Sequence, residues 1–295
     1  MLIDPRRTAV HAGQGFLMGA ADIVPGVSGG TVALVVGIYE RLVRSIRAAA
    51  AVPVVLARGD GRAARQRLGE VDWALVVPLV LGIVAAIAVG ALTLLPLIEA
   101  YPEHTAAVFF GLIVASLALP WGRVQRRSRG ILVAAAGGAV AAFVLVGLPE
   151  IDAAAPSLPR VAATAAVAIC AMILPGVSGA YLLTVFGIYT PTLEALRALD
   201  VAYIATFVAG AALGLGLFAK LLETLLARWH DATMAVLTGL MVGALRALWP
   251  WLDDERALLV PPAEPTTAVV VALGIAAFVG LRLLLRLGDR AAASA

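Results

Sequence analysis

Charged residues and cysteine are scarce in this chain of 295 residues. Only 14% of the residues are charged and 62% are hydrophobic, whereas a soluble domain carries about 25% charged and about 45–50% apolar residues. A core of the chain's own could not hide so much apolar surface from water, which excludes a soluble globular protein. The single cysteine, Cys170, excludes an intramolecular disulfide and is interpreted as a small buried hydrophobe. The sequence therefore predicts an all-α polytopic membrane protein.

Histidine and regularly spaced aromatic residues are scarce too. His11, His104 and His230 lie far apart without metal-ligand spacing, so we predict no metal site. The arginine-rich segment 41–70 has no regular aromatic residues, which argues against nucleic acid and favours attraction to anionic lipid headgroups. The start of the chain has no apolar run before a small-residue cleavage site, so we expect no removable signal peptide.

Six apolar stretches are long enough to cross a membrane, since a spanning helix needs about 20 apolar residues. They cover roughly residues 73–98, 105–121, 131–148, 201–227, 232–249 and 267–287. Two further apolar regions, 13–40 and 160–190, are each interrupted by the motif PGVSG. The arms on either side of this motif are too short to cross, so each region needs another explanation.

Loop charges indicate that these two regions are re-entrant. Arg6 and Arg7 precede the first region and an arginine cluster, Arg41 to Arg67, follows it. The positive-inside rule places both flanks in the cytoplasm, so the region enters and leaves on one side as a helical hairpin with PGVSG at its tip. Alternating loop charges then place both termini in the cytoplasm and make the second hairpin enter from the opposite face. The charge bias is weakest around residues 220–231.

The two hairpins are copies of one another. At an offset of 150, ADIVPGVSGGTVALVVGIY (21–39) and AMILPGVSGAYLLTVFGIY (171–189) are identical at eleven of nineteen positions. At an offset of 128, AVFFGLIVASLALPW (107–121) aligns with AVLTGLMVGALRALW (235–249). The sequence is therefore an internal repeat.

Each half of the chain, residues 1–150 and 151–295, contains one hairpin and three spans. Because three is odd, the halves lie in opposite orientations, which is an inverted-topology repeat typical of secondary transporters. Two hairpins that enter from opposite faces are expected to bring their tips together near the membrane midplane.

The broken helices at PGVSG point to an anion site. Free backbone groups are tolerated in lipid only where they are buried in protein or line a wet cavity. Pro25 and Pro175 would end the first arms, and the exposed N–H groups of the second arms favour a phosphate or carboxylate. The predicted binding residues are Gly26, Ser28, Gly29, Gly30, Thr31, Gly176, Ser178, Gly179 and Arg246. The alternative is that the glycines only permit close packing and the serines only cap helices.

Other polar residues near the hairpins have two interpretations each. Asp22, whose counterpart is Met172, would carry a coupling proton or sodium ion, or pair with an arginine. Glu40 and Arg41 form an interfacial ion pair or, second, a gate. Arg246 and Lys220 neutralise the phosphate or extend to the interface. Further hydroxyl groups that could reach the substrate belong to Tyr39, Tyr181, Thr184 and Tyr189.

The pattern GxxMGAADIVPGVSGGT, Gly15 to Thr31, with ILPGVSGAY and the GIY after each motif, resembles the bacterial polyprenyl-phosphate transporter family PopT. The similarity covers essentially the whole chain. It implies a flippase of the bacterial cytoplasmic membrane that recycles undecaprenyl phosphate from the outer to the inner leaflet for peptidoglycan and cell-envelope synthesis. Alternating access, with no cofactor beyond a coupling proton or sodium ion, is the expected mechanism. Oligomeric state and lipid chain length are not predicted.

Two other functions remain as alternatives. Membrane polyprenyl-pyrophosphate phosphatases also carry a Pro-Gly-x-Ser element, but an arginine follows their serine, whereas Gly29 and Gly179 stand there in this chain. No pairing of a nucleophile with a base is apparent near Ser28, so we expect no enzyme activity. The second alternative is a secondary transporter for a small anion, which the sequence does not distinguish from a lipid carrier.

Overall fold

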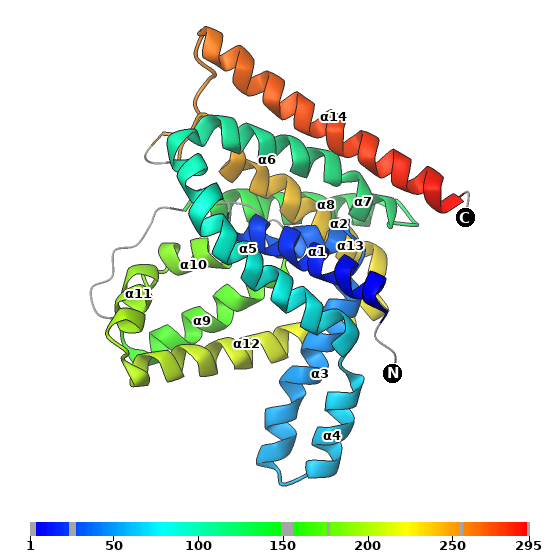
Figure 1. Cartoon of the computed structure of the whole chain (residues 1–295), viewed down its shortest axis with the longest axis vertical. Helices are drawn as coiled ribbons and strands as arrows, with labels where there is room; N and C mark the ends of the chain where they lie inside the picture. The colour runs from blue at the N-terminus through cyan, green and yellow to red at the C-terminus, as the bar shows by residue number, and fades with distance from the viewer. Residues whose placement is uncertain (1–3, 24–27, 149–155, 176–177, 254–255, 294–295) are drawn as a thin grey trace.

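The computed structural model describes residues 4–23, 28–148, 156–175, 178–253 and 256–293, and Figure 1 shows their arrangement. Within these residues the regular structure is helical, apart from one isolated bridge between Leu252 and Leu258. The prediction of an all-α protein is confirmed.

The first half of the chain forms eight helices within the described residues. They are α1 (Pro5–Ile23), α2 (Gly29–Val35), α3 (Tyr39–Ala57), α4 (Gly61–Glu70), α5 (Trp73–Ala100), α6 (Pro102–Ser116), α7 (Ala118–Gly122) and α8 (Arg129–Val146). The second half forms the remaining elements. They are α9 (Leu158–Ile173), α10 (Gly179–Val185), α11 (Tyr189–Arg197), α12 (Val201–Arg228), α13 (His230–Ala244), the 3-10 helix η1 (Leu245–Leu248) and α14 (Pro265–Ala293).

Six helical segments are long and apolar enough to cross a membrane. They are Trp73–Ile98, Pro102–Gly122, Arg129–Val146, Val201–Arg228, His230–Leu248 and Pro265–Leu287. Each overlaps one of the six predicted stretches, so the protein is a multi-pass membrane protein as the composition predicts.

Each PGVSG region consists of a long helix, a break and a short helix. The short helices α2 and α10 have seven residues each, about 10 Å of helix, and pack back on α1 and α9. Each ends before a glycine with positive φ, Gly37 at 78° and Gly187 at 69°, a conformation that costs glycine little. The first long arm begins at Pro5, before the predicted start at residue 13, because the polar residues ahead of it are also helical. Entry of each hairpin from one membrane face stays a prediction.

The arginine-rich segment that the sequence analysis treats as a loop is a helical pair. Helices α3 and α4 pack on each other and project from the rest of the molecule (Figure 1). Asp60 caps α4 by accepting a hydrogen bond from the Ala63 N–H at 2.9 Å. An ion pair between Arg47 and Glu223 joins α3 to α12.

The same pairs of helices pack in both halves of the chain. Helix α1 lies along α5 as α9 lies along α12, and glycines allow the close approach. A Cβ added at Gly82 would overlap the carbonyl oxygen of Ala12, and one at Gly210 would overlap that of Ala162. These residues are related by the offsets of 150 and 128 found in the sequence. The packing supports the internal repeat, and the opposite orientation of the halves stays a prediction.

The halves also interlock. Helix α14 of the second half packs on α6 of the first, and α8 of the first packs on α13 of the second (Figure 1). Gly111 faces the carbonyl oxygen of Gly274, and its equivalent Gly239 faces that of Ala135. The two halves therefore share one helical bundle and do not form separate domains in space.

These close contacts predict equivalent effects of substitution in the two halves. Gly82→Ala and Gly210→Ala should each destabilise the protein by about 1–3 kcal/mol, because the added methyl group overlaps a backbone carbonyl that cannot move alone. Thermal unfolding in detergent measures the difference. The control is Gly137→Ala on α8, where a Cβ meets no atom within 4 Å and alanine favours the helix. If Gly82→Ala and Gly210→Ala reduced stability no more than Gly137→Ala does, the result would contradict the shared packing.

Candidate functional site at the hairpin tips

The two hairpins touch each other at their tips. The Ser28 hydroxyl donates a hydrogen bond to the carbonyl oxygen of Met172 at 3.2 Å, across 144 residues of sequence. A Cβ added at Gly30 would lie 2.5 Å from the carbonyl oxygen of Ile173, so only glycine fits there. The start of α2 thus packs against the end of α9, so Ser28 and Gly30 of the first predicted set contact the second hairpin at Met172 and Ile173.

The start of α2 already holds an anionic group from its own chain. Ser28 is the N-cap, and its Oγ accepts the Gly30 N–H at 3.1 Å. The Asp22 carboxylate accepts the Gly29 N–H at 2.6 Å, and the Ser28 carbonyl accepts that of Thr31 at 2.9 Å. Asp22 therefore lies where a helix N-terminus stabilises negative charge. The described residues show no arginine paired with it.

The second tip has the same cap without the carboxylate. Ser178 is the N-cap of α10, and its Oγ accepts the Tyr181 N–H at 3.3 Å. Met172 takes the position of Asp22, and its side chain lies against Gly179. The two tips therefore share geometry but differ in charge.

Burial also differs between the tips. Ser28 and Thr31 are each 1% exposed, whereas Ser178 is half-buried. Pro175 is buried at the end of the first arm of the second hairpin. Three predicted residues, Pro25, Gly26 and Gly176, lie outside the described residues.

Arg246 lies beside the second hairpin, with its guanidinium on neighbouring backbone groups. It donates to the carbonyl oxygen of Phe143 in α8 at 3.2 Å and to that of Arg256, in the segment after η1, at 3.0 Å. Arg256 in turn stacks 4.3 Å above the ring of Tyr181, whose hydroxyl lies 2.8 Å from the carbonyl oxygens of Val146 and Leu148. The described contacts of Arg246 thus connect it to α10 through Arg256 and Tyr181, and include no direct bond to Ser28 or Ser178.

Arg256 was missed by the sequence analysis because it belongs to the acidic segment WLDDERA. Its position beside Tyr181 depends on a loop fold, with a positive φ of 63° at Arg256 itself, and no spacing rule identifies that contact. Among the other predicted residues, Lys220 is exposed on α12 and Tyr189 is 41% exposed. The Thr184 hydroxyl bonds the Ala180 carbonyl within α10.

The two GIY tyrosines are not equivalent. Tyr39 is 1% exposed, and its hydroxyl has no hydrogen-bond partner among the described residues. Its copy Tyr189 lies at the surface. Only Tyr39 is part of the core that also contains Leu34, Leu237 and Met234.

Glu40 and Arg41 each form an ion pair, but with other residues and not with each other. Consecutive helical side chains point in different directions, so each finds its own partner. Glu40 lies 3.8 Å from Arg123 and 3.7 Å from His230. Arg41 instead donates to Asp72, at 2.6 Å from Nη2 and 3.2 Å from Nε.

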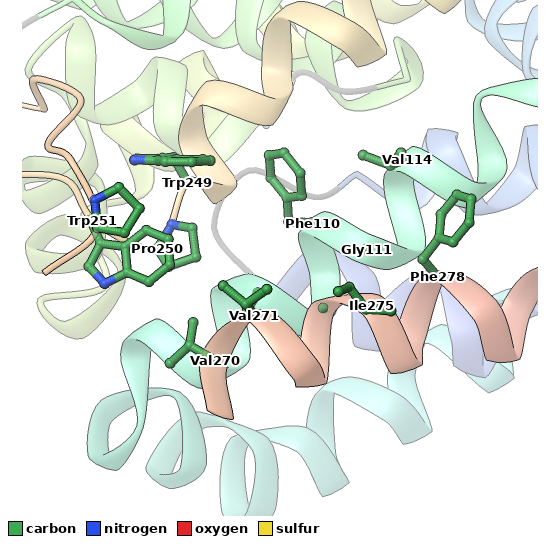
Figure 2. Close-up of a pocket in the computed structure, with 13 residues that line it drawn as sticks. Phe110, Gly111, Val114, Trp249, Pro250, Trp251, Val270, Val271, Ile275 and Phe278 are labelled. Carbon is green, nitrogen blue, oxygen red and sulfur yellow. The ribbon is translucent and has the colours of Figure 1, made fainter. Parts of the chain in front are cut away.

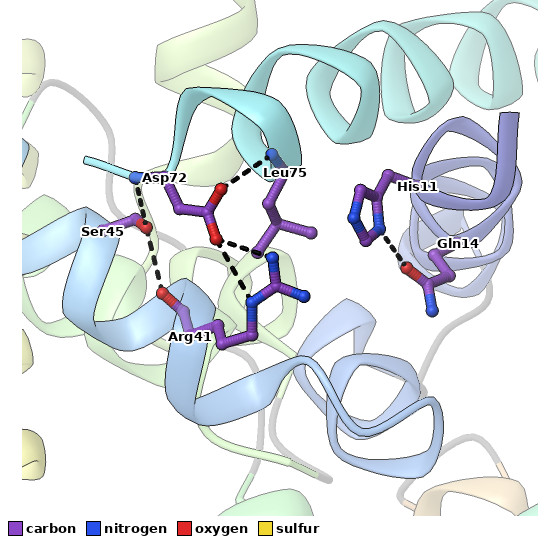
Figure 3. Close-up of polar contacts among 6 residues, drawn as sticks. All are labelled: His11, Gln14, Arg41, Ser45, Asp72 and Leu75. Atoms are coloured by element: carbon purple, nitrogen blue, oxygen red, sulfur yellow. Dashed lines mark hydrogen bonds and ion pairs between the residues drawn. The ribbon is translucent and has the colours of Figure 1, made fainter. Parts of the chain in front are cut away.

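Asp72 connects α3 to the start of α5 (Figure 3). Its carboxylate caps α5 by accepting the Leu75 N–H at 3.2 Å. The Ser45 hydroxyl accepts the Asp72 N–H at 3.2 Å and donates to the Arg41 carbonyl at 3.0 Å. Burial alone would raise the pKa of Asp72, but the hydrogen bonds and charge of Arg41 outweigh it and hold the pKa below its ordinary value.

The lowered pKa predicts how stability changes in acid. The carboxylate of Asp72 contributes fully at neutral pH, and the contribution is lost as pH falls through its depressed folded-state pKa, below about 4. Asp72→Asn should cost about 1 kcal/mol at pH 7 and reduce the loss of stability between pH 5 and pH 3. Thermal unfolding across this range measures both effects.

The control for this prediction is Asp4→Asn, which removes an exposed carboxylate 3.5 Å from Arg7 and should change little. An unchanged acid profile for Asp72→Asn would contradict the role given to the Arg41–Asp72 pair.

Known proteins resemble this chain over a region that includes the hairpin tips. Residues 18–260 match the family described as VCA0040-like, undecaprenyl phosphate translocase-like. The polyprenyl-phosphate transporter of Vibrio cholerae serotype O1 (strain ATCC 39315 / El Tor Inaba N16961) is 36% identical over 240 residues, which cover 81% of this chain and 77% of that protein. No solved structure matches the chain. The family match includes the second hairpin and the first from residue 18 onward, and it ends before α14.

Proposed function

This chain belongs to the undecaprenyl phosphate translocase-like family, and we propose that it carries undecaprenyl phosphate from the outer to the inner leaflet of the bacterial cytoplasmic membrane. The names of the family and of the Vibrio relative describe transport, which confirms the expectation that the protein is not an enzyme. The carrier lipid would then return to the cytoplasmic side for cell-envelope synthesis.

The observation that best supports a headgroup site is the contact between the hairpin tips. An isolated charged group is costly to bury in a low-dielectric interior, by tens of kcal/mol in Born estimates. Backbone N–H groups, helix dipoles and the hydroxyls of Ser28, Thr31 and Ser178 would lower that cost. The Ser28–Met172 hydrogen bond joins the first tip to the second hairpin, which supports a site where one phosphate group would contact both tips.

Asp22 would supply an ion-coupled step in the transport cycle. Its carboxylate holds the Gly29 N–H, a donor that a phosphate oxygen would also use. Two anions at one helix N-terminus repel each other, so binding of the phosphate requires Asp22 to take up a proton, bind a cation such as sodium, or move away. If Asp22 takes up a proton or a cation, the substrate and the coupling ion would bind together.

Alternating access follows from the repeat. The matching pairs α1–α5 and α9–α12 are the units that would rock against the interlocked helices α6, α8, α13 and α14. One arrangement would open the tips to the outer side and the other to the cytoplasm. Both chain termini would lie in the cytoplasm, as the arginine-rich loops indicate.

Transfer of the lipid between leaflets tests the proposal. Purified protein in proteoliposomes, with undecaprenyl phosphate and an assay of headgroup accessibility, should give transfer without release of inorganic phosphate. Ser28→Ala and Asp22→Asn should each slow transfer about tenfold or more, because a hydrogen bond to a charged group is worth about 1.5–3 kcal/mol. Arg246→Ala is compared in the same assay and should slow transfer less, because its guanidinium bonds backbone carbonyls.

Two controls keep the assay specific. Ser116→Ala removes a buried hydroxyl whose bond within the described part of the chain is to the Ile113 carbonyl in α6, and Asp60→Asn removes the charge of an exposed helix cap and keeps its hydrogen-bond acceptor. Both should transfer lipid like the wild type. Release of inorganic phosphate would instead indicate a phosphatase, and equal transport of free phosphate would indicate a small-anion carrier.

A further inference from the structure

Two apolar cavities of similar size lie among the spans. One, of about 350 Å³, lies between α12 and α13. The other, of about 320 Å³, lies between α6, α14 and the segment after η1, where Trp249 and Trp251 line it (Figure 2). Both volumes fall at the lower end of the range for ligand sites.

Of these two cavities, the one between α12 and α13 reaches a hairpin tip. Leu174, the residue before Pro175, lines it together with Leu240 of α13. The two residues that precede Leu174 are Met172 and Ile173, whose carbonyl oxygens contact the first tip. The cavity therefore begins next to the proposed phosphate site, whereas the cavity in Figure 2 is lined by no tip residue.

The packing of the repeat explains why this gap exists. Helix α12 lies along α9, with Gly210 and Gly214 against carbonyl oxygens of α9. Helix α13 lies along α8, with Gly239 and Gly243 against backbone atoms of α8. Each of these consecutive spans is thus held by a different partner, and they diverge from their shared turn at Trp229.

The cavity lining suits hydrocarbon and not a headgroup. Leucine, phenylalanine, valine, alanine and tryptophan side chains form the wall, and Thr233 is its one hydroxyl residue. That hydroxyl donates within its own helix to the Trp229 carbonyl at 2.9 Å. An anionic or hydrophilic ligand would leave its polar groups unpaired here.

We propose that this cavity binds the first isoprene units of the polyprenyl chain, and that the rest of the chain leaves between α12 and α13 into the bilayer. The inference rests on the proposed function, because the chain is bonded directly to the phosphate and must leave the tips through an adjacent apolar opening. Burial of isoprene units in the cavity adds affinity for the lipid that a free phosphate lacks.

Photo-crosslinking locates the chain directly. The probe is a polyprenyl phosphate with a diazirine on an isoprene unit close to the phosphate, added to wild-type protein in proteoliposomes. Crosslinked peptides should map to α12 and α13 around Phe218, Val236 and Leu240. Crosslinks confined to α6 and α14 would overturn the inference, and so would transfer of the probe without any crosslink to α12 or α13.

Substitutions that fill each cavity give an independent test. Val236→Phe and Ala232→Leu reduce the space between α12 and α13, and Val271→Phe is the matched control in the other cavity. The first two variants should bind undecaprenyl phosphate about tenfold more weakly than the wild type does. Their affinity for ethyl phosphate, which has the headgroup without the chain and is measured by competition, should be unchanged. The control should bind both ligands like the wild type.

The two ligands separate failure of this inference from failure of the proposed function. A wild-type protein that binds neither ligand contradicts the proposed function itself. A wild type that binds both, with variants that bind undecaprenyl phosphate normally, overturns the chain site alone. Equal losses for both ligands in both filling variants would also overturn it, since the effect would then lie at the headgroup or in the fold.

Discussion

The structure depends on one constraint: a helix broken inside an apolar bundle must find partners for its free N–H and C=O groups. Ser28 and Ser178 meet part of this demand as N-caps, and Asp22 meets another part at Gly29. A further partner comes from the opposite hairpin, where the Ser28 hydroxyl donates to the Met172 carbonyl. The breaks thus hold the two hairpins together at the place where the headgroup would bind.

Features with a local cause could be predicted from the sequence. The six spans follow from run length, and the serine caps follow from PGVSG. The internal repeat is visible at the hairpins and at residues 107–121 and 235–249, but the contacts of Gly82 with α1 and of Gly210 with α9 became apparent only in the structure. Features that depend on side-chain direction or loop folding could not be predicted. Arg41 bonds Asp72 instead of Glu40, and Arg256 reaches Tyr181 through a loop with an unusual backbone angle.

Close packing through glycine also decides where the bundle is open. Gly210 and Gly214 hold α12 to α9, and Gly239 holds α13 to α8. Dispersion contacts are short-ranged. Because α12 packs closely on α9 and α13 packs closely on α8, space is left between α12 and α13. In this chain that space lies beside Leu174. The same glycines that make the repeat compact therefore create an apolar gap next to the second tip.

The difference in charge between the tips fits a carrier for a phosphate monoester. Such a group carries about −1.5 to −2 charges near neutral pH, and each further carboxylate beside it would add repulsion at short range. Asp22 supplies one carboxylate at the first tip, while Met172 leaves the second tip neutral. Two aspartates would require two protons or cations for every lipid bound. One aspartate would require at most one, so under the proposed ion-coupled cycle the difference between Asp22 and Met172 would limit the number of coupling ions for each lipid.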